Sequence, residues 1–572
     1  MAGIAGWIAS ARRAADENAL GAMAAALSHR HGDEPLSGLV DADDRRQVVL
    51  GATLRDEAAG IALVLDGGIA NAAELRAALS KRGYAFATSG AHEVLLRAYQ
   101  QWDKDVVKQL RGGFAFAIWD ARKDRLLIAR DRFGEKPLYL HERDGALYFA
   151  SEPKALLKAG APASVDPKAL WDCLAHRYVP GPRTLFAGIR KLAPGSYGLW
   201  QFGKLREVRY WTAPDRNPHT VNGKITDPVE GFVGVLEEAV KQQASGGLLL
   251  SGGIDSAVLA ALVSKLGTKP KTYSLGFEGD KCSELPHAAA VAEHFGTQHQ
   301  EIVIAPRELL SSLPRLVAQG DAPLSRPSQL VACRLASEAS RTTKTVLSGD
   351  GCDEVLGGYR RYVAHVRHVP MRLFAPLVRA GRFDSAAAEL KLNGWRHQLS
   401  VLKINPDDKK NDADERASSL RQALYLDQTT WLPDLVLEGA ERAAAAASLQ
   451  ARMPFLDHRV AEYVSSLPDE QRVRGFTTKW ILREAARRVL PAPLRRRPKA
   501  GWRLDVASWL RNELRDFTLD HLQGGSSVTR AYYDNATLDR VLEDHLKGKK
   551  NYETLLWTLL NIEIWHRTYT PG

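Results

Sequence analysis

Long apolar segments are missing from this chain of 572 residues, although 45% of its residues are hydrophobic. No run approaches the roughly 20 apolar residues that a membrane-spanning helix needs, so no membrane segment is predicted. The N-terminus also lacks a basic region followed by an apolar stretch, so no signal peptide is expected. The charged fraction of 25% is ordinary for a globular protein, and the length allows more than one domain.

Cysteine is also scarce. The four cysteines, Cys173, Cys282, Cys333 and Cys352, are scattered without paired spacing. This pattern argues against a disulfide framework and against a cysteine zinc site. It is typical of a protein in the reducing cytoplasm, which is the predicted location.

Acidic residues are outnumbered by basic ones, and the formal net charge is +11. An acidic partner or substrate would suit this charge, but a basic surface with nucleotide-binding residues explains it more simply. The basic residues are dispersed, apart from residues 495–497 and Lys499, and no nucleic-acid-binding module is recognisable. We therefore expect neither nucleic acid nor a membrane as a partner.

The first part of the chain reads as short strands with helices between them. Strand-like runs lie at 61–65, 114–119 and 125–129, and the helical patterns are at 20–28, 72–82 and 93–102. A stretch rich in proline, asparagine and glycine then predicts a linker. The predicted organisation is a first domain at 1–212, a linker at 213–226 and a second domain at 227–572.

Strands and helices alternate after the linker. Buried strands are expected at 247–250, 271–277 and 343–347, and a helix at 257–266. This alternation predicts an α/β domain with a doubly wound parallel sheet, which binds ligands at the carboxyl ends of its strands. From about residue 365 the chain is mostly helical, and the alanine-rich stretch 440–448 is expected to be a close-packed helix.

Two glycine-rich loops follow strands of this predicted sheet. Residues 251–256 read SGGIDS and precede a helix, so backbone N–H groups and the helix N-terminus could hold phosphate. An acid in this loop would repel phosphate but could bind Mg²⁺. A plain strand–helix turn would explain the first loop alone. The second loop, SGDGCDE at 348–354, makes that explanation insufficient, because a surface turn does not need three acids so close together.

Ordered motifs along nearly the whole chain resemble the asparagine synthetase superfamily. In the first domain they are HRHGD at 29–33, RGGFA at 111–115, ARDRFGEKPLY at 129–139 and FASE at 149–152. In the second they are the two loops, PFLDHR at 454–459, TKWILRE at 478–484 and RPKAG at 497–501. The resemblance implies an N-terminal Ntn-hydrolase-like αββα glutaminase-type domain. It also implies a C-terminal ATP-pyrophosphatase domain with a helical C-terminal part.

The synthetase domain of that family adenylates a carboxylate with ATP, releases pyrophosphate and lets an amine displace AMP. The resemblance implies that Asp255 and Asp353 hold Mg²⁺. It implies Asp350 and Lys479 as catalytic residues, the acid in intermediate formation and amine deprotonation and the lysine in stabilising charge. The residues implied in ATP binding are Leu249, Ser251, Gly252, Gly253, Asp255, Ser256, Leu275, Ser348 and Gly349.

The first domain departs from the family at the glutaminase positions. Family members have a nucleophilic cysteine after the initiator methionine, and this chain has Ala2. The oxyanion-hole asparagine is replaced by Asp66, the glutamine-holding glutamate by Gly68, and the amine-binding aspartate by Ala91. An engineered substitution is one explanation of Ala2. Several altered positions favour natural loss instead, with the first domain kept as a structural relic.

The segments that lie near the carboxylate substrate in the family also depart from the family pattern. The family's Asp-Glu-Pro and Gly-Asp-Pro-Ser segments here read DAPLSRPS at 321–328, so one acid is gone and the cation Arg326 has appeared. The family's Asp-Arg-Ala-Ser-Met-Ala helix here reads ERAAAA at 441–446, and Gln450 replaces a glutamate. These changes weaken the case for aspartate as the substrate.

Three functions are compatible with these residues. The first is an ATP-dependent amide-bond-forming ligase that uses no glutamine, best represented by a lasso-peptide (macrolactam) cyclase with a precursor peptide and a processing protease as partners. The second is an ammonia-dependent asparagine synthetase or small-molecule amide synthetase. The third is a non-catalytic scaffold, against which the intact acids and lysine argue. A β-lactam synthetase is disfavoured because it has tyrosine at the Asp350 position, and a tRNA-thiolating enzyme because the cysteine spacing is absent.

Overall fold

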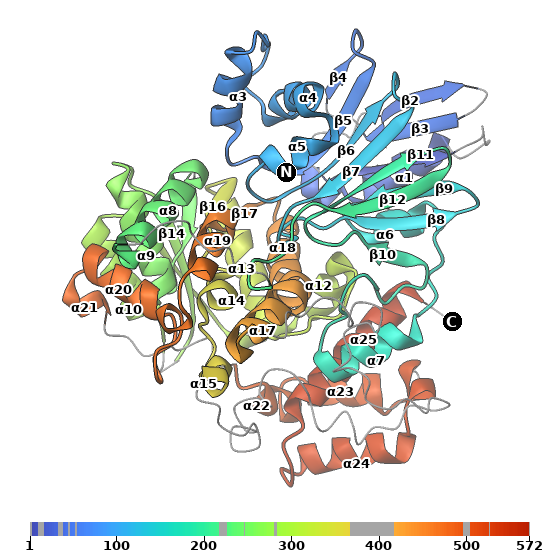
Figure 1. The fold of residues 1–572 in the computed structure, drawn as a ribbon. Helices are drawn as coiled ribbons and strands as arrows, with labels where there is room; N and C mark the ends of the chain where they lie inside the picture. Colours follow the sequence, from blue (N-terminus) through green and yellow to red (C-terminus); the bar gives the residue numbers. More distant parts are fainter. Residues whose placement is uncertain are drawn as a thin grey trace.

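The computed structural model of the chain has two parts that pack against each other (Figure 1). Two antiparallel six-stranded sheets form the N-terminal part, and a five-stranded parallel sheet forms the centre of the C-terminal part. No helix among the described residues is long and apolar enough to cross a membrane. The structure describes residues 3–9, 17–31, 38–43, 46–51, 54–216, 226–244, 246–279, 283–366, 417–495, 504–525 and 527–570.

The two N-terminal sheets pack face to face between helices. One sheet has the order β10 (Ile189–Lys191), β8 (Tyr139–Arg143), β9 (Ala146–Ala150), β1 (Ala5–Ala9), β3 (Arg46–Gly51), β2 (Gly38–Asp43). The other has the order β12 (Lys204–Arg209), β11 (Ser196–Gln201), β7 (Arg125–Arg130), β6 (Phe114–Asp120), β5 (Ile61–Gly67), β4 (Leu54–Asp56).

Alternating side chains explain this layering. Ile8 of β1 and Ala117 of β6 belong to the core between the sheets. Trp7 faces the opposite way and packs in the core that includes helix α1 (Glu17–Ala26), while Phe116 packs against α4 (Ala91–Trp102). The predicted αββα arrangement is therefore confirmed.

All five strands of the C-terminal sheet run parallel, in the order β15 (Gln298–Ile304), β14 (Lys271–Phe277), β13 (Gly247–Leu249), β16 (Thr345–Leu347), β17 (Gln450–Arg452). The strands that follow β13 in the chain, β14 and β15, lie on one side of it in the sheet, and β16 and β17 lie on the other side. The order therefore reverses between these two strands, and the loops that follow them lie side by side. The predicted doubly wound parallel sheet is confirmed.

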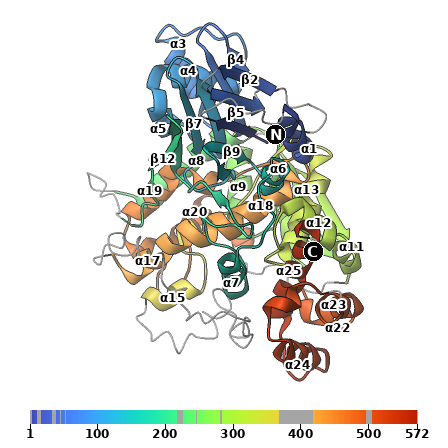
Figure 2. The ribbon, with the colours of Figure 1, turned by 90° about the vertical axis from the view of Figure 1, so that its right-hand side faces the viewer.

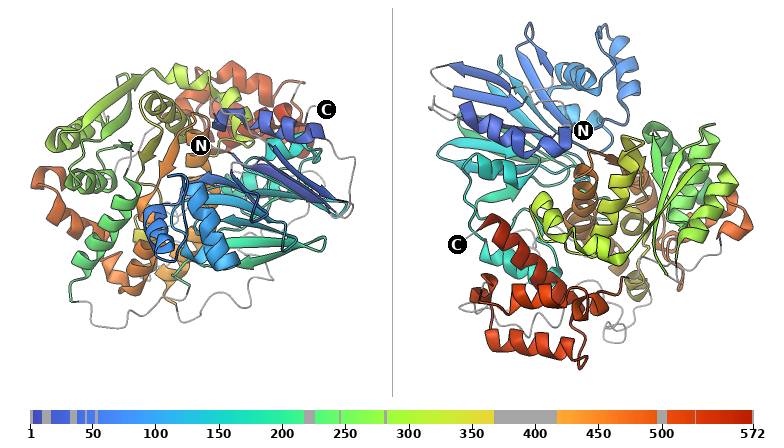
Figure 3. Two further views of the ribbon diagram at one scale, coloured as in Figure 1. Left: turned by 90° about the horizontal axis from the view of Figure 1, so that it is seen from above. Right: turned by 180° about the vertical axis from the view of Figure 1, so that it is seen from behind.

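Helices cover both faces of the parallel sheet (Figures 1 and 2). On one face α8 (Pro228–Gln243), α9 (Ile254–Lys265) and α20 (Trp480–Val489) share a core with Leu248 and Leu347. On the other, α12 (Leu313–Gly320) and α13 (Ser328–Ser340) share a core with Leu275, and α25 (Glu553–Tyr569) packs against α12. Figure 3 shows the C-terminal helices gathered below the sheets, at the end opposite α3 (Ala72–Ser80).

A long helix lies at the junction of the two parts. It begins as α17 (Ser419–Leu426), continues as a π-helical segment, η3 (Asp427–Leu437), and ends as α18 (Glu438–Ala445). The predicted alanine-rich helix is thus present, but it starts earlier than expected and contains Pro433. A proline is expected to interrupt the hydrogen bonding of an α-helix, so the residues around it did not predict one continuous helix.

The other predicted elements are present with ends shifted by a few residues. The proposed linker falls between β12, which ends at Arg209, and α8, which begins at Pro228. Its exact limits stay a prediction, since residues 217–225 lie outside the described part of the chain. Ala2, Cys282, residues 496–501 and residues 367–416 also lie outside it.

Candidate active site

The two glycine-rich loops meet at the point where the strand order reverses. The first loop leaves β13 and enters α9 through Gly252, whose φ is +69°. A Cβ at this position would lie 2.5 Å from the backbone nitrogen of Ala288, so only glycine fits. A Cβ at Gly349 of the second loop would lie 3.3 Å from the Cβ of Asp255. The predicted nucleotide loops therefore lie against each other.

Hydrogen bonds within the first loop shape an anion site. The Ser251 and Ser256 hydroxyl oxygens lie 3.2 Å apart, and the backbone N–H of Gly253 donates to Ser251 Oγ at 3.3 Å. Gly253 is the N-cap of α9 and offers no capping side chain, so the first-turn N–H groups are left for a ligand. This geometry suits the phosphates of a nucleotide.

Lys479 joins the acids of the two loops. Its Nζ lies 2.7 Å from Asp255 Oδ2 and 2.7 Å from Asp353 Oδ1. The lysine is only 3% exposed, and burial alone would lower its pKa, but Asp255 and other neighbouring groups hold its pKa well above the ordinary value. The residues predicted as metal ligands and charge stabiliser are therefore in direct contact.

Gly358 makes this close approach possible. A Cβ there would lie 1.9 Å from Asp353 Oδ1 and 2.1 Å from Lys479 Cε, so any side chain would displace the ion pair. Gly358 was not predicted to have a role, and the only sequence signal for it is its place in a Gly-Gly-Tyr run, residues 357–359, just after the second loop. Cys352 was missed as well, and its thiol donates a hydrogen bond to Asp255 Oδ1 at 3.4 Å.

Asp350 lies in the same loop, and the Ser348 hydroxyl donates a hydrogen bond to its Oδ2 at 2.7 Å. Burial raises the pKa of Asp350 above its ordinary value. The Ser348 hydroxyl and the Arg326 guanidinium oppose this rise. A carboxylate with a raised pKa is a better proton acceptor, which suits the base role predicted for this residue.

The acids present suit Mg²⁺ bound together with a nucleotide. Mg²⁺ is usually held by one or two carboxylates and by substrate phosphates. Asp255 and Asp353 provide two carboxylates around one cation, the Lys479 ammonium. Within the described ranges no cluster of three or more histidine, cysteine or acidic residues could hold a metal by itself. The arrangement fits a metal that arrives with its nucleotide.

The two leucines predicted to contact adenosine lie on neighbouring strands. Leu249 ends β13 and is half-buried, whereas Leu275 lies on β14 and is 3% exposed. Both pack in the core on the α12–α13 face of the sheet. Leu249 is thus the more accessible of the two from the loops.

Two of the altered glutaminase positions, Asp66 and Gly68, lie at the interface with the C-terminal part. Asp66 is fully buried, and its Oδ2 accepts hydrogen bonds from Arg30 Nη2 and from Ser151 Oγ, both at 2.9 Å. Arg30 also pairs with Glu152 at 2.6 Å and with Glu441 of α18. The carboxylate at the oxyanion-hole position therefore belongs to a buried ion network that spans both parts of the chain.

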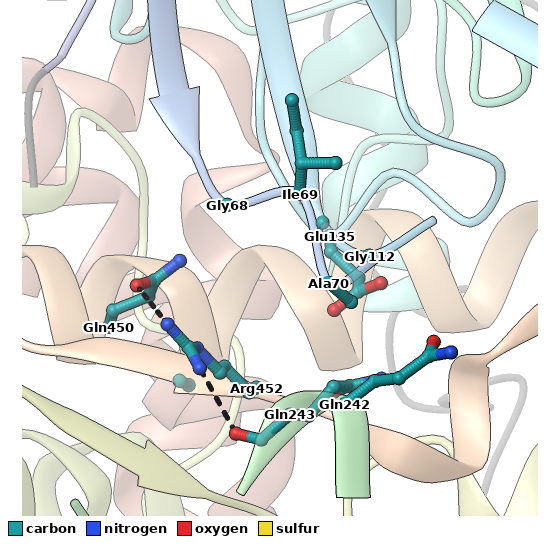
Figure 4. Close-up of a pocket in the computed structure, with 11 residues that line it drawn as sticks. Gly68, Ile69, Ala70, Gly112, Glu135, Gln242, Gln243, Gln450 and Arg452 are labelled. Atoms are coloured by element: carbon teal, nitrogen blue, oxygen red, sulfur yellow. Dashed lines mark hydrogen bonds between the residues drawn. The ribbon is translucent and has the colours of Figure 1, made fainter. Parts of the chain in front are cut away.

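Gly68 lies against a second altered position. A Cβ on Gly68 would lie 2.8 Å from Gln450 Nε2, so the lost glutamate side chain has left room for this glutamine. The two residues line a small interface pocket that is partly open to solvent (Figure 4). Arg452 crosses its floor and donates hydrogen bonds to Gln450 Oε1 and to the backbone oxygen of Gln243.

The remaining altered position, Ala91, begins helix α4. The following residue, His92, is half-buried, and the partial burial of its ring lowers its pKa. An alanine methyl group offers no charge to an amine, unlike the aspartate that the family resemblance implies at this position.

The two parts of the chain match two known protein families. Residues 232–567 match the family described as asparagine synthase, and residues 1–211 match the glutamine amidotransferase domain family. Asparagine synthetase (glutamine-hydrolyzing) 1 of Bacillus subtilis is 31% identical, over 88% of this chain and 85% of its own length. Asparagine synthetase (glutamine-hydrolyzing) 3 of the same species is 28% identical, over 84% and 81%. Asparagine synthetase B of Escherichia coli is 30% identical, over 61% and 63%.

Proposed function

This chain belongs to the asparagine synthase family, and we propose that it is an ATP-dependent carbon–nitrogen ligase that joins a carboxylate to an amine without hydrolysing glutamine. One contrast carries the proposal. Asp255, Asp353 and Lys479 form one contact at the nucleotide loops, whereas Asp66 and Gly68 are rewritten at the glutaminase positions.

Activation of the carboxylate uses the first loop and the lysine. A substrate carboxylate oxygen attacks the α-phosphorus of ATP, the bond to the β-phosphate bridge breaks, and pyrophosphate leaves with the electron pair. The open N-terminus of α9 and the Gly252–Gly253 turn stabilise the departing charge. Lys479 adds a buried ammonium where that charge develops. Mg²⁺ held by Asp255 and Asp353 would supply further charge neutralisation at the phosphates.

Amide formation then uses Asp350. The amine nitrogen attacks the activated acyl carbon, the bond from that carbon to the AMP oxygen breaks, and AMP leaves. The nitrogen loses its proton to the Asp350 carboxylate, whose pKa is raised by burial. The Ser348 hydroxyl, 2.7 Å from Oδ2, orients this carboxylate.

The source of the amine is proposed to be the substrate itself. Glutamine hydrolysis needs a nucleophile and donors that stabilise an oxyanion. Here the side chain at the oxyanion position is a carboxylate bound to Arg30, and the residue after the initiator methionine is Ala2. The altered segments at 321–328 and 441–446 support an acceptor other than free aspartate. A lasso-peptide cyclase, in which a peptide amine attacks its own adenylated side chain, combines these features.

The test uses the full chain with Mg-ATP and the short peptides encoded by neighbouring genes. A peptide product lighter by one water, formed together with AMP and pyrophosphate, supports the cyclase. AMP release with aspartate and ammonium instead supports an ammonia-dependent synthetase, the function that the relatives' names favour. Absence of pyrophosphate exchange with every carboxylate overturns the ligase. Asp350→Asn should abolish the reaction, and the control Asp516→Asn, whose side chain is 92% exposed, should retain it.

A further inference from the structure

Asp215 lies in the predicted linker between the two parts of the chain, yet it is only 1% exposed. Its Oδ1 and Oδ2 both accept hydrogen bonds from Arg472 Nη1, at 2.6 and 2.8 Å. Oδ1 also accepts from Ser465 Oγ at 3.1 Å, and Oδ2 accepts from Gln428 Nε2 at 3.0 Å. Connecting segments usually run over the surface, so a buried linker carboxylate with this many partners calls for an explanation.

The first of these partners leads to Lys479. Arg472 is fully buried, and its backbone oxygen accepts a hydrogen bond from the N–H of Trp480 at 2.9 Å. Between these two residues the chain forms a tight hairpin, in which Arg474 and Thr477 exchange two backbone hydrogen bonds of 2.9 Å. Lys479 lies at the base of this hairpin in the left-handed conformation, with a φ of +52°. The position of Lys479 therefore depends on where the Arg472 guanidinium is held.

The second partner leads to the second glycine-rich loop. Gln428 is 3% exposed, and its Nε2 donates both to Asp215 Oδ2 and to the backbone oxygen of Glu354, the latter at 3.1 Å. Glu354 follows Asp353 in the chain, and Asp353 Oδ1 lies 2.7 Å from Lys479 Nζ. Both members of this ion pair are thus tied to the Asp215 carboxylate, each through one buried side chain.

The N-terminal part of the chain fixes the segment that carries Asp215. The Tyr210 hydroxyl donates a hydrogen bond to the backbone oxygen of Arg130 at 3.0 Å. The Trp211 ring packs edge-on against Phe133, with the ring centres 4.8 Å apart. Asp215 follows four positions later. The N-terminal sheets are therefore connected, through this short segment, to the residues that hold the nucleotide loops.

We propose that Asp215 is a positioning residue of the adenylation site. It holds the Lys479 hairpin and the second glycine-rich loop at the separation at which Lys479 meets Asp353. The inference rests on the proposed ligase function, and it makes the segment between the two parts a working component of the site. A small displacement of a charge-stabilising group is enough to slow a reaction strongly, so the effect on carboxylate activation is expected to be large.

Trace acetylation of lysines tests the placement of Lys479 without depending on turnover. The full chain is treated with acetic anhydride well below its melting temperature, and peptide mass spectrometry compares Lys479 with Lys136, a 2% exposed lysine that pairs with Glu441 at 2.7 Å. Asp215→Asn should raise the ratio of Lys479 to Lys136 labelling by about tenfold, because losing a charge-assisted hydrogen bond increases the population of a locally open form. Gln428→Leu removes only the connection to the second loop and should raise the ratio less.

The matched control is Asp434→Asn. Asp434 is another buried acid between the two parts, and it accepts hydrogen bonds from the Gly181 N–H at 2.8 Å and from Lys191 Nζ at 2.9 Å. Among the described residues none of its hydrogen-bond partners belongs to the Lys479 hairpin or the glycine-rich loops. This variant should lower the melting temperature but leave the labelling ratio unchanged, which separates positioning from general stability.

Pyrophosphate exchange with N-acetyl-L-aspartate N-methylamide gives the second readout. Asp215→Asn should lower the maximal rate on the order of 10–100-fold with little change in the KM for ATP. In the Lys479→Met background the same substitution should have no further effect, because it acts through the lysine.

The inference is overturned if neither Asp215→Asn nor Gln428→Leu changes the labelling ratio, or if the kinetic effects of Asp215→Asn and Lys479→Met are additive. If Asp215→Asn does not fold, the labelling of Gln428→Leu decides alone. Absence of exchange by the wild-type chain with every carboxylate would refute the ligase proposal, and the labelling ratio would still decide whether Asp215 positions Lys479.

Discussion

Removing the ammonium of Lys479 tests the centre of the site. Lys479→Met keeps the aliphatic stem and the left-handed backbone (φ 52°) but leaves Asp255 and Asp353 without the cation that they share. Breaking a fully buried ion pair costs about 3–5 kcal/mol. The side chains of Asp255 and Asp353 are 26% and 22% exposed, so water solvates them partly once the lysine charge is removed. We therefore expect the free energy of unfolding to fall by about 2–3 kcal/mol.

The assay is thermal unfolding followed with and without Mg²⁺. In EDTA the variant should melt several degrees below the wild-type chain. Mg²⁺ should raise the melting temperature of the variant even without nucleotide, because the two carboxylates can then bind the metal. It should not affect the wild-type chain, in which the lysine stands between them. Pyrophosphate exchange should fall by about 10²–10³-fold.

The control is Lys265→Met, an exposed lysine that pairs with Glu237 at 2.5 Å. Its melting temperature should change little, since exposed ion pairs contribute about 0–1 kcal/mol. Equal melting temperatures of Lys479→Met and the wild-type chain in EDTA would refute the reasoning. Equal stabilisation of both proteins by Mg²⁺ would refute it as well.

Three further predictions concern buried groups elsewhere. Arg30→Met should lower the free energy of unfolding by about 3–5 kcal/mol, because three buried acids lose the cation that they share. It should also make the junction of the two parts more sensitive to limited proteolysis, and unchanged stability would contradict the prediction. Gly68→Glu restores the family residue but should release no glutamate from glutamine. It should lower the melting temperature because its Cβ would lie 2.8 Å from Gln450 Nε2, and adding Gln450→Ala should recover part of the lost melting temperature. Glu354 has a pKa raised by burial to about 7, from an ordinary value of 4.5, so its protonated form is favoured in the folded state. Its contribution to stability is complete below pH 4.5 and is lost as the pH rises through 7, so Glu354→Gln should flatten the melting temperature between about pH 5 and pH 8, and an unchanged slope would count against it.

The sequence predicted the parts of the fold that depend on local periodicity. Apolar runs gave β13, β14 and β16, and the parallel order followed from the helices between them. Because ligand loops in such sheets gather where the order reverses, the meeting of the SGGIDS and SGDGCDE loops was also predictable. These inferences need only the residues next to each strand.

The contacts that complete the site depend on distant residues, and spacing gives no access to them. Lys479 is 224 positions from Asp255, and only the family resemblance pointed to it. Gly358 is needed because two side chains meet where its Cβ would be, which no local pattern reveals.

The N-terminal part of the chain gives a second example of contacts that the sequence did not reveal. Asp66 departs from the family pattern, and its carboxylate would repel an oxyanion. The structure adds that the carboxylate is bound by Arg30, which reaches Glu441, a residue 411 positions away on α18. The altered position is therefore part of the contact between the two halves.

The most direct test of the central claim measures carboxylate activation and glutamine hydrolysis in one reaction. The full chain is incubated with Mg-ATP, glutamine and N-acetyl-L-aspartate N-methylamide, and pyrophosphate exchange and glutamate release are followed together. The account predicts exchange that requires the carboxylate, with no glutamate released above the level of a protein-free control. Glutamate released in proportion to AMP would contradict it, as would glutamate release without any carboxylate activation.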